Sequence, residues 1–119
     1  MVEQKLYNAS RLEEMTDGDT KFAKEMIEYF INIYEEVIQN LFYYYEKEDW
    51  NMLRRTAHKF LSNASMLGAF SIVGNIDEIE DLALQKKKND NIPELINTVN
   101  KDCKILSIQF ENDFLKDNN

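Results

Sequence analysis

The sequence predicts an all-α protein, an antiparallel up-down-up-down four-helix bundle with a short extra helix at the N-terminus. Apolar residues recur with helical spacing over nearly the whole chain. Only 3 of the 119 residues are glycine and 1 is proline, too few for the many turns of a sheet of short strands. We expect residues 1–119 to form a single domain, since this length suits one domain with a self-sufficient core.

Composition excludes several classes of function. Counts of 14 basic and 22 acidic side chains give a formal net charge of −8, which repels phosphate backbones and argues against sequence-independent nucleic-acid binding. The single cysteine excludes an intrachain disulfide and a cysteine-based zinc site, and the single histidine excludes a His-pair metal site. We therefore expect no metal site. The sequence contains no run of about 20 apolar residues, the length that is needed to span a bilayer. The N-terminus also lacks a signal-peptide pattern. We therefore expect a cytoplasmic protein without membrane contact.

The first 46 residues predict a short helix followed by a long one. Asn8 or Ser10 can cap a short helix that runs to about Met15. A glycine-containing turn at 16–19 precedes a long helix over 20–46, for which Asp19 or Thr20 is the candidate N-cap. Two apolar rows on this long helix are expected to face the core: first Ala23, Met26, Phe30, Ile33, Val37, Leu41 and Tyr44, and then Ile27, Ile31, Tyr34, Ile38 and Phe42.

Three further helices complete the predicted bundle. Asp49 can cap a helix over 50–67, which Gly68 ends. The next helix is expected over 69–87, with three lysines in its last turn. Asn91 is expected to cap the final helix. That helix carries an apolar stripe with alternating steps of four and three: Ile92, Ile96, Val99, Cys103, Leu106 and Phe110.

The only histidine is expected on the solvent side of the helix over 50–67. At about 100° per residue, His58 points about 140° away from the centre of the apolar stripe. An exposed neutral imidazole offers one nitrogen as a nucleophile, which can accept a phosphoryl group. A polar surface histidine with no special role has the same spacing, so spacing alone leaves both interpretations open.

Positive charge gathers around this histidine in a chain that is otherwise acidic. Arg54, Arg55 and Lys59 are its neighbours along the helix, and Ser62 adds a hydroxyl donor. A phosphoryl group on the ring carries nearly two negative charges, so these side chains are candidate supporting residues.

The segment 57–69, Ala-His-Lys-Phe-Leu-Ser-Asn-Ala-Ser-Met-Leu-Gly-Ala, resembles the signature of the histidine phosphotransfer (HPt) domain family. Three other places share this resemblance: the Gly-Asp entry into the long helix at 18–19, the Glu-Asp-Trp turn at 48–50 and the Ile-Glu pair at 79–80. The resemblance covers most of the chain and implies the same helical bundle.

The sequence departs from the family pattern at two positions next to the histidine. Three residues after it, where the family usually has lysine, this chain has Leu61, and one residue later, where glycine is usual, it has Ser62. The leucine removes a cation, for which Lys59 and Arg55 are the nearest replacements, although they lie on the other side of the ring. Such a change bears on the efficiency of transfer.

The resemblance also implies a partner for the imidazole. The family has an acidic or amide residue on the facing helix that hydrogen-bonds the ring and fixes its tautomer. By position this residue is Glu80. The alternative is that Glu80 is an ordinary solvated charge on its helix.

The function that the resemblance implies is that of a phosphorelay carrier. His58 would take a phosphoryl group from the aspartyl phosphate of a response-regulator receiver domain and pass it to another receiver's aspartate. The chain would act without kinase activity and without a cofactor of its own, since Mg²⁺ is expected on the receiver. Its expected partners are receiver domains, a hybrid sensor histidine kinase, or both, and we expect the protein itself to be a monomer.

Apolar surface near the histidine predicts where a receiver docks. The candidate docking residues are Phe30, Ile33, Leu61 and Ser65. Burial of the extra apolar row under the short first helix is the alternative. Two other functions stay open: an HPt-like module that only binds a receiver or kinase without phosphotransfer, and a domain of a larger sensor kinase that is phosphorylated directly by a kinase domain.

Overall fold

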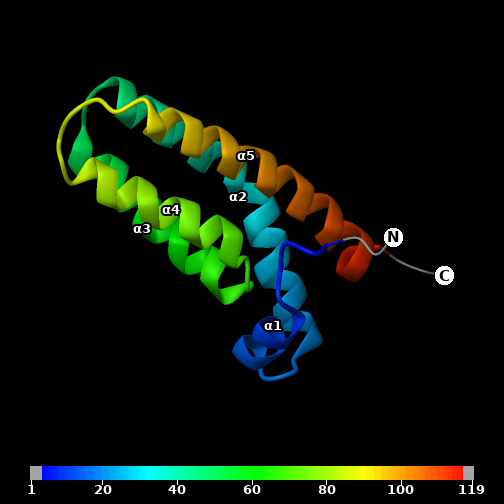
Figure 1. Ribbon diagram of the computed structural model, residues 1–119. Coiled ribbons are helices and arrows are strands. Elements are labelled where there is room, and N and C mark those ends of the chain that lie inside the picture. The colour runs from blue at the N-terminus through cyan, green and yellow to red at the C-terminus, as the bar shows by residue number, and fades with distance from the viewer. Residues whose placement is uncertain (1–3, 117–119) are drawn as a thin grey trace.

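Four long helices form an antiparallel bundle, and a short helix lies across one end of it (Figure 1). The structure is a computed structural model and describes residues 4–116. Its elements are α1 (Ala9–Thr16), α2 (Thr20–Glu46), α3 (Trp50–Met66), α4 (Phe70–Ala83), α5 (Asn91–Phe110) and a π-helical turn, η1 (Glu111–Leu115). No strand occurs among the described residues, and the predicted all-α bundle is confirmed. Within residues 4–116, every helix is too short or too polar to span a bilayer.

Polar side chains cap the first three helices at the positions that the sequence predicts. Each cap accepts a hydrogen bond from a backbone N–H in the first turn of its helix: Asn8 from Arg11, Asp19 from Phe22, and Asp49 from Met52. Such bonds satisfy N–H groups that have no partner inside the helix. The long helix α2 has the bounds expected for it, 20–46.

Two glycines form the turns before α2 and after α3. Gly18 before α2 and Gly68 after α3 have φ angles of 75° and 71°, in the left-handed region that favours glycine. At Gly68 space is limiting as well, because an added Cβ would lie 2.7 Å from the Cβ of Asn8 and 2.8 Å from its backbone nitrogen. The predicted end of the histidine-bearing helix is therefore confirmed, and the turn after it packs against the start of α1.

The buried stripe of α2 differs from both rows predicted for it. It takes members from each row and adds one tyrosine: Ala23, Ile27, Phe30, Tyr34, Ile38, Leu41 and Tyr45. Four residues expected at the centre of the core are only half-buried at its edge: Met26, Ile33, Val37 and Tyr44. The reason is that α2 packs against both α3 and α5, so its buried axis lies between the two rows. The stripe predicted for α5 is confirmed, since all six of its residues are buried.

The connection between α4 and α5 corrects two expectations. α4 ends at Ala83, four residues before the predicted end, and Lys86 has a left-handed φ of 53°, so the three lysines lie in a loop. Asn91 does not cap α5. Its own backbone N–H donates instead to Oδ1 of Asn89 at 2.9 Å. The hydroxyl of Tyr45, at the end of α2, bonds both the N–H and the carbonyl of Asn89, at 3.1 and 3.2 Å.

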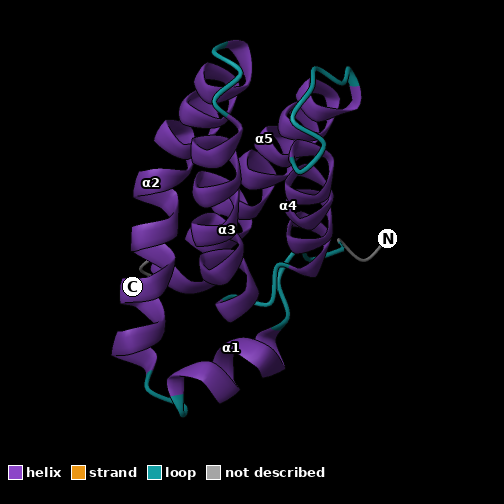
Figure 2. Cartoon of the chain, turned by 90° about the vertical axis from the view of Figure 1, so that its left-hand side faces the viewer, coloured by secondary structure: helices purple, strands orange, loops and turns teal. Residues whose placement is uncertain are grey.

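The segment before α1 is bound to the end of α5. Gln109 accepts a hydrogen bond from the N–H of Leu6 at 2.8 Å and donates one to the carbonyl of Gln4 at 2.9 Å. The hydroxyl of Tyr7 donates to Asp113 at 2.7 Å. These contacts bring α1 across the end of the bundle at which α2 begins (Figure 2), away from the middle of α3, which carries the histidine.

Candidate functional site

α3 presents His58 on the side of the helix that faces away from the core. The opposite side is buried through Leu53, Ala57, Phe60 and Ala64. Because His58 lies outside this stripe, 73% of its side chain is exposed. The predicted exposure of the imidazole is confirmed.

Glu80 of α4 contacts the imidazole. Its Oε1 lies 2.9 Å from Nδ1 of His58, and 18% of the Glu80 side chain is exposed. The buried residues Ile76 and Ile79 orient α4 so that the next residue, Glu80, lies at the flank beside α3. A carboxylate only accepts hydrogen bonds, so Nδ1–H donates and Nε2 keeps its lone pair. The contact implied by the family resemblance is thus present, and Nε2 is the nitrogen available as a nucleophile.

A shallow depression surrounds the imidazole and contains the three predicted cations. It is lined by Asn51, Arg54, Arg55, His58, Lys59 and Glu80. Among residues 4–116, none of the three cations forms an ion pair. Asn51 was not among the predicted supporting residues, although it lies seven residues before the histidine, two helical turns away on the same face. The described residues contain no group of three or more His, Cys, Asp or Glu side chains arranged to hold a metal ion.

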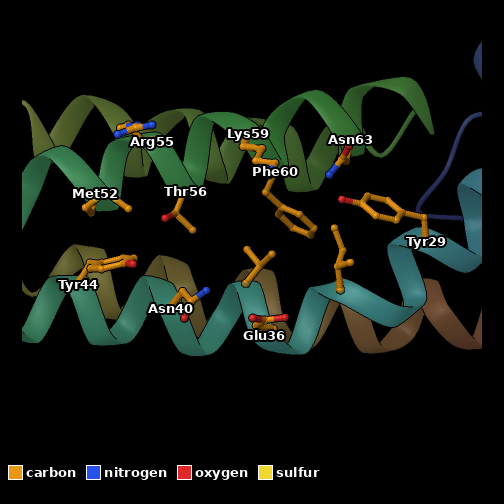
Figure 3. A pocket seen from close by; sticks show the side chains of 12 residues that line it. Tyr29, Glu36, Asn40, Tyr44, Met52, Arg55, Thr56, Lys59, Phe60 and Asn63 are labelled. Carbon is orange, nitrogen blue, oxygen red and sulfur yellow. The ribbon is translucent and has the colours of Figure 1, made fainter.

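A groove between α2 and α3 lies on the other flank of the histidine helix (Figure 3). Arg55 and Lys59 line this groove too, with Glu36 on the opposite helix. Sequence reasoning missed it. The feature that could have indicated this groove is a set of polar residues on the facing flanks of the two helices, which are half-buried in the structure: Asn40, Thr56 and Asn63.

One of the four predicted docking residues is wrong. Phe30 is 0% exposed, because its ring stacks on Phe60 and Tyr34 with centroid separations of 5.8 and 5.7 Å, and it cannot meet a partner. The other three are half-buried and retain some accessible surface: Ile33, Leu61 and Ser65. Ser62, the predicted hydroxyl donor, is exposed one turn after His58.

Comparison with known proteins assigns this bundle to a family. The sequence model of the Hpt domain matches residues 21–112. The chain belongs to the Hpt domain family. Its function is accordingly histidine phosphotransfer in a two-component phosphorelay.

The fold of this Hpt domain is similar to that of a solved structure. The crystal structure of histidine-containing phosphotransfer protein B (HptB) from Pseudomonas aeruginosa PAO1 matches with a TM-score of 0.84 at 22% identity. The match covers 95% of this chain and 97% of that one. At this identity the likeness concerns the fold. Curated proteins gave no significant match to the sequence.

Proposed function

We propose that His58 carries the phosphoryl group of this Hpt domain between the aspartates of response-regulator receiver domains. Phosphotransfer in this family requires an accessible imidazole, and His58 is the only histidine in the chain. The observation that supports the proposal best is the combination of 73% exposure with a hydrogen bond from Nδ1 to Glu80. Together these leave Nε2 free to react with a group on another protein.

The transfer step follows from this geometry. The lone pair of Nε2 attacks the phosphorus of an aspartyl phosphate in line, an N–P bond forms, and the P–O bond to the aspartate breaks to leave a carboxylate. The imidazole then bears a positive charge, with Nδ1–H still donating to the carboxylate of Glu80, which stabilises that charge. The reverse reaction passes the phosphoryl group to a second aspartate and restores the neutral ring.

The receiver supplies the remaining chemistry in this proposal. Mg²⁺ would lie on the receiver beside its aspartate, and the Hpt domain would bind no cofactor itself. The domain would therefore act as a carrier, a nucleophile and then a phosphodonor, without kinase activity of its own. We further propose that it works as a monomer in the cytoplasm, with its receiver partner in a response regulator or a hybrid sensor histidine kinase.

We place the docking of the receiver on the face of α3 around the imidazole and on the adjoining α2–α3 groove. Leu61 and Ser65 lie one and two turns beyond His58 on α3, and Ile33 lines the groove between α2 and α3. An apolar hollow continues this surface toward the end of α3. Its exposed aromatic residues are Phe22 and Tyr29. A partner that covers this surface would bury apolar area and bring its aspartate to the ring.

The proposal is tested by mixing the protein with a receiver domain phosphorylated by acetyl phosphate. The expected result is an acid-labile phosphoryl group on the Hpt domain, detected by intact mass, which is absent in His58→Gln. Equal labelling of His58→Gln would overturn the assignment. Binding of the receiver with no phosphoryl uptake by the wild-type chain would instead support the binding-only module.

A further inference from the structure

This chain lacks the cation that the family pattern provides beside the phosphorylated histidine. The position three residues after His58 is Leu61, whose side chain packs against the core. We propose that Arg54 takes over this role and binds the phosphoryl group on His58 from the α4 flank of α3. This inference rests on the proposed phosphorylation of His58.

Helical geometry distinguishes Arg54 from the other two cations. At about 100° per residue, Arg54 lies about 40° around the helix from His58, and Leu61 lies about 60° away in the same direction. Arg55 and Lys59 lie about 60° and about 100° away in the opposite direction. Arg54 therefore occupies the flank from which a lysine at position 61 would reach the ring.

The surroundings of the three cations agree with this division. Arg55 and Lys59 line the α2–α3 groove, where Glu36 offers them a carboxylate on the opposite helix (Figure 3). Arg54 does not line that groove and contributes only to the depression that contains His58 and Glu80. Its absence from the α2–α3 groove agrees with the helical geometry, which puts Arg54 on the flank of α3 away from that groove, toward α4 and Glu80.

Arg54 also has unused hydrogen-bonding capacity. Its Nε is shielded from solvent and has no hydrogen-bond partner, and its guanidinium forms no ion pair within the described residues. A buried donor without a partner is unfavourable. The planar fork of N–H donors on arginine matches the oxygens of a phosphoryl group, which it binds through two parallel hydrogen bonds. A phosphoryl group on Nε2 of His58 would provide these acceptors.

The test uses phosphoramidate, a small phosphodonor for histidine, so that no receiver is needed. The full chain is phosphorylated, the donor is removed, and hydrolysis of phospho-His58 is followed by intact mass. We expect Arg54→Ala to hydrolyse about tenfold faster than wild type, from the loss of a charge-assisted hydrogen bond. Lys104→Ala, at an exposed cation of α5 outside this site, is the control and is expected within about twofold of wild type. Arg55→Ala and Lys59→Ala, on the other flank of α3, are expected to have smaller effects than Arg54→Ala.

A double variant tests directly on which side of the ring the cation must lie. Adding Leu61→Lys to Arg54→Ala should restore most of the wild-type lifetime, because the lysine supplies a cation on the same side of the ring. Arg54→Gln replaces Arg54→Ala if the latter lowers the melting temperature. The inference is overturned if the Arg54 variants match wild type, or if Arg55→Ala or Lys59→Ala has the larger effect. Failure of the wild-type chain to label at His58 would overturn the proposed function itself, and this inference with it.

Discussion

Glu80 on α4 accepts a hydrogen bond at 2.9 Å from Nδ1 of His58 on α3, across 22 residues of sequence. The glutamate is largely covered and the imidazole largely exposed, with 18% and 73% of their side chains accessible. A largely covered residue of α4 therefore orients an imidazole that stands in solvent on α3. This contact leaves Nε2 as the nitrogen to which our proposal assigns phosphoryl transfer.

Replacing Glu80 by alanine should impair the chemistry more than the fold. Without the carboxylate, the ring loses its preferred tautomer and the partner for its positive charge, so we expect phosphoryl uptake from a receiver to slow about tenfold. Initial rates, and the tautomer ratio from long-range ¹H–¹⁵N NMR of the ring, measure the two effects. Glu78→Ala, at an exposed position of the same helix, is the control. An unchanged tautomer ratio and rate in Glu80→Ala would contradict the assignment.

Phe30 and its neighbour Tyr29 should differ sharply in their contributions to stability. Phe30→Ala removes a fully buried ring and should lower the free energy of unfolding by about 3–5 kcal/mol. Tyr29 is 50% exposed, and its replacement by alanine should change that free energy by no more than about 0.5 kcal/mol. Urea denaturation measures both. A Phe30→Ala variant with wild-type stability and weak receiver binding would return this residue to the docking surface.

Two glycine substitutions should act in opposite directions. Gly68→Ala forces a side chain into a left-handed conformation and into contact with Asn8, so we expect a loss of at least about 1–2 kcal/mol in the free energy of unfolding. Gly74 lies within α4 with nothing within 4 Å of an added Cβ, so Gly74→Ala should stabilise by about 0.5–1 kcal/mol. Chemical denaturation of the two variants side by side checks the signs, and stabilisation by Gly68→Ala would refute the turn geometry.

The contact between Tyr7 and Asp113 should make stability depend on pH in the acid range. The hydroxyl of Tyr7, together with Lys5, holds the pKa of the Asp113 carboxyl below its ordinary value. The contact therefore adds stability above the unfolded carboxyl pKa of about 3.9, and this contribution is lost as the pH falls through the lower folded pKa.

Tyr7→Phe tests this contact without removing the aromatic ring. The pKa of Asp113 should rise toward its ordinary value in this variant, as followed by NMR titration of the carboxyl carbon. Tyr43→Phe, at an exposed tyrosine far from this carboxylate in sequence, should leave the titration unchanged. If Tyr7→Phe also leaves it unchanged, the hydroxyl is not the main cause of the shift.

Local signals in the sequence are enough to determine most helix boundaries and the exposure of the histidine. The caps at Asn8, Asp19 and Asp49 and the turns at Gly18 and Gly68 depend on hydrogen bonds and φ angles within a few residues. The periodic stripes of α3 and α5 depend on the helical repeat alone. For these features each helix carries the necessary information in its own sequence.

Tertiary packing determines structural features that the sequence of no single helix specifies. α2 lies against two neighbours, so the centre of its buried face, and with it the burial of Phe30, depends on where α3 and α5 approach it. The early end of α4 accompanies a loop that Tyr45 of α2 binds through Asn89. The distance from Glu80 to His58 depends on how α4 packs against α3, and so does the identity of the helix that the Arg54 flank of α3 faces. Periodicity places a residue on a face of its own helix, whereas only the packed bundle determines which neighbour that face meets.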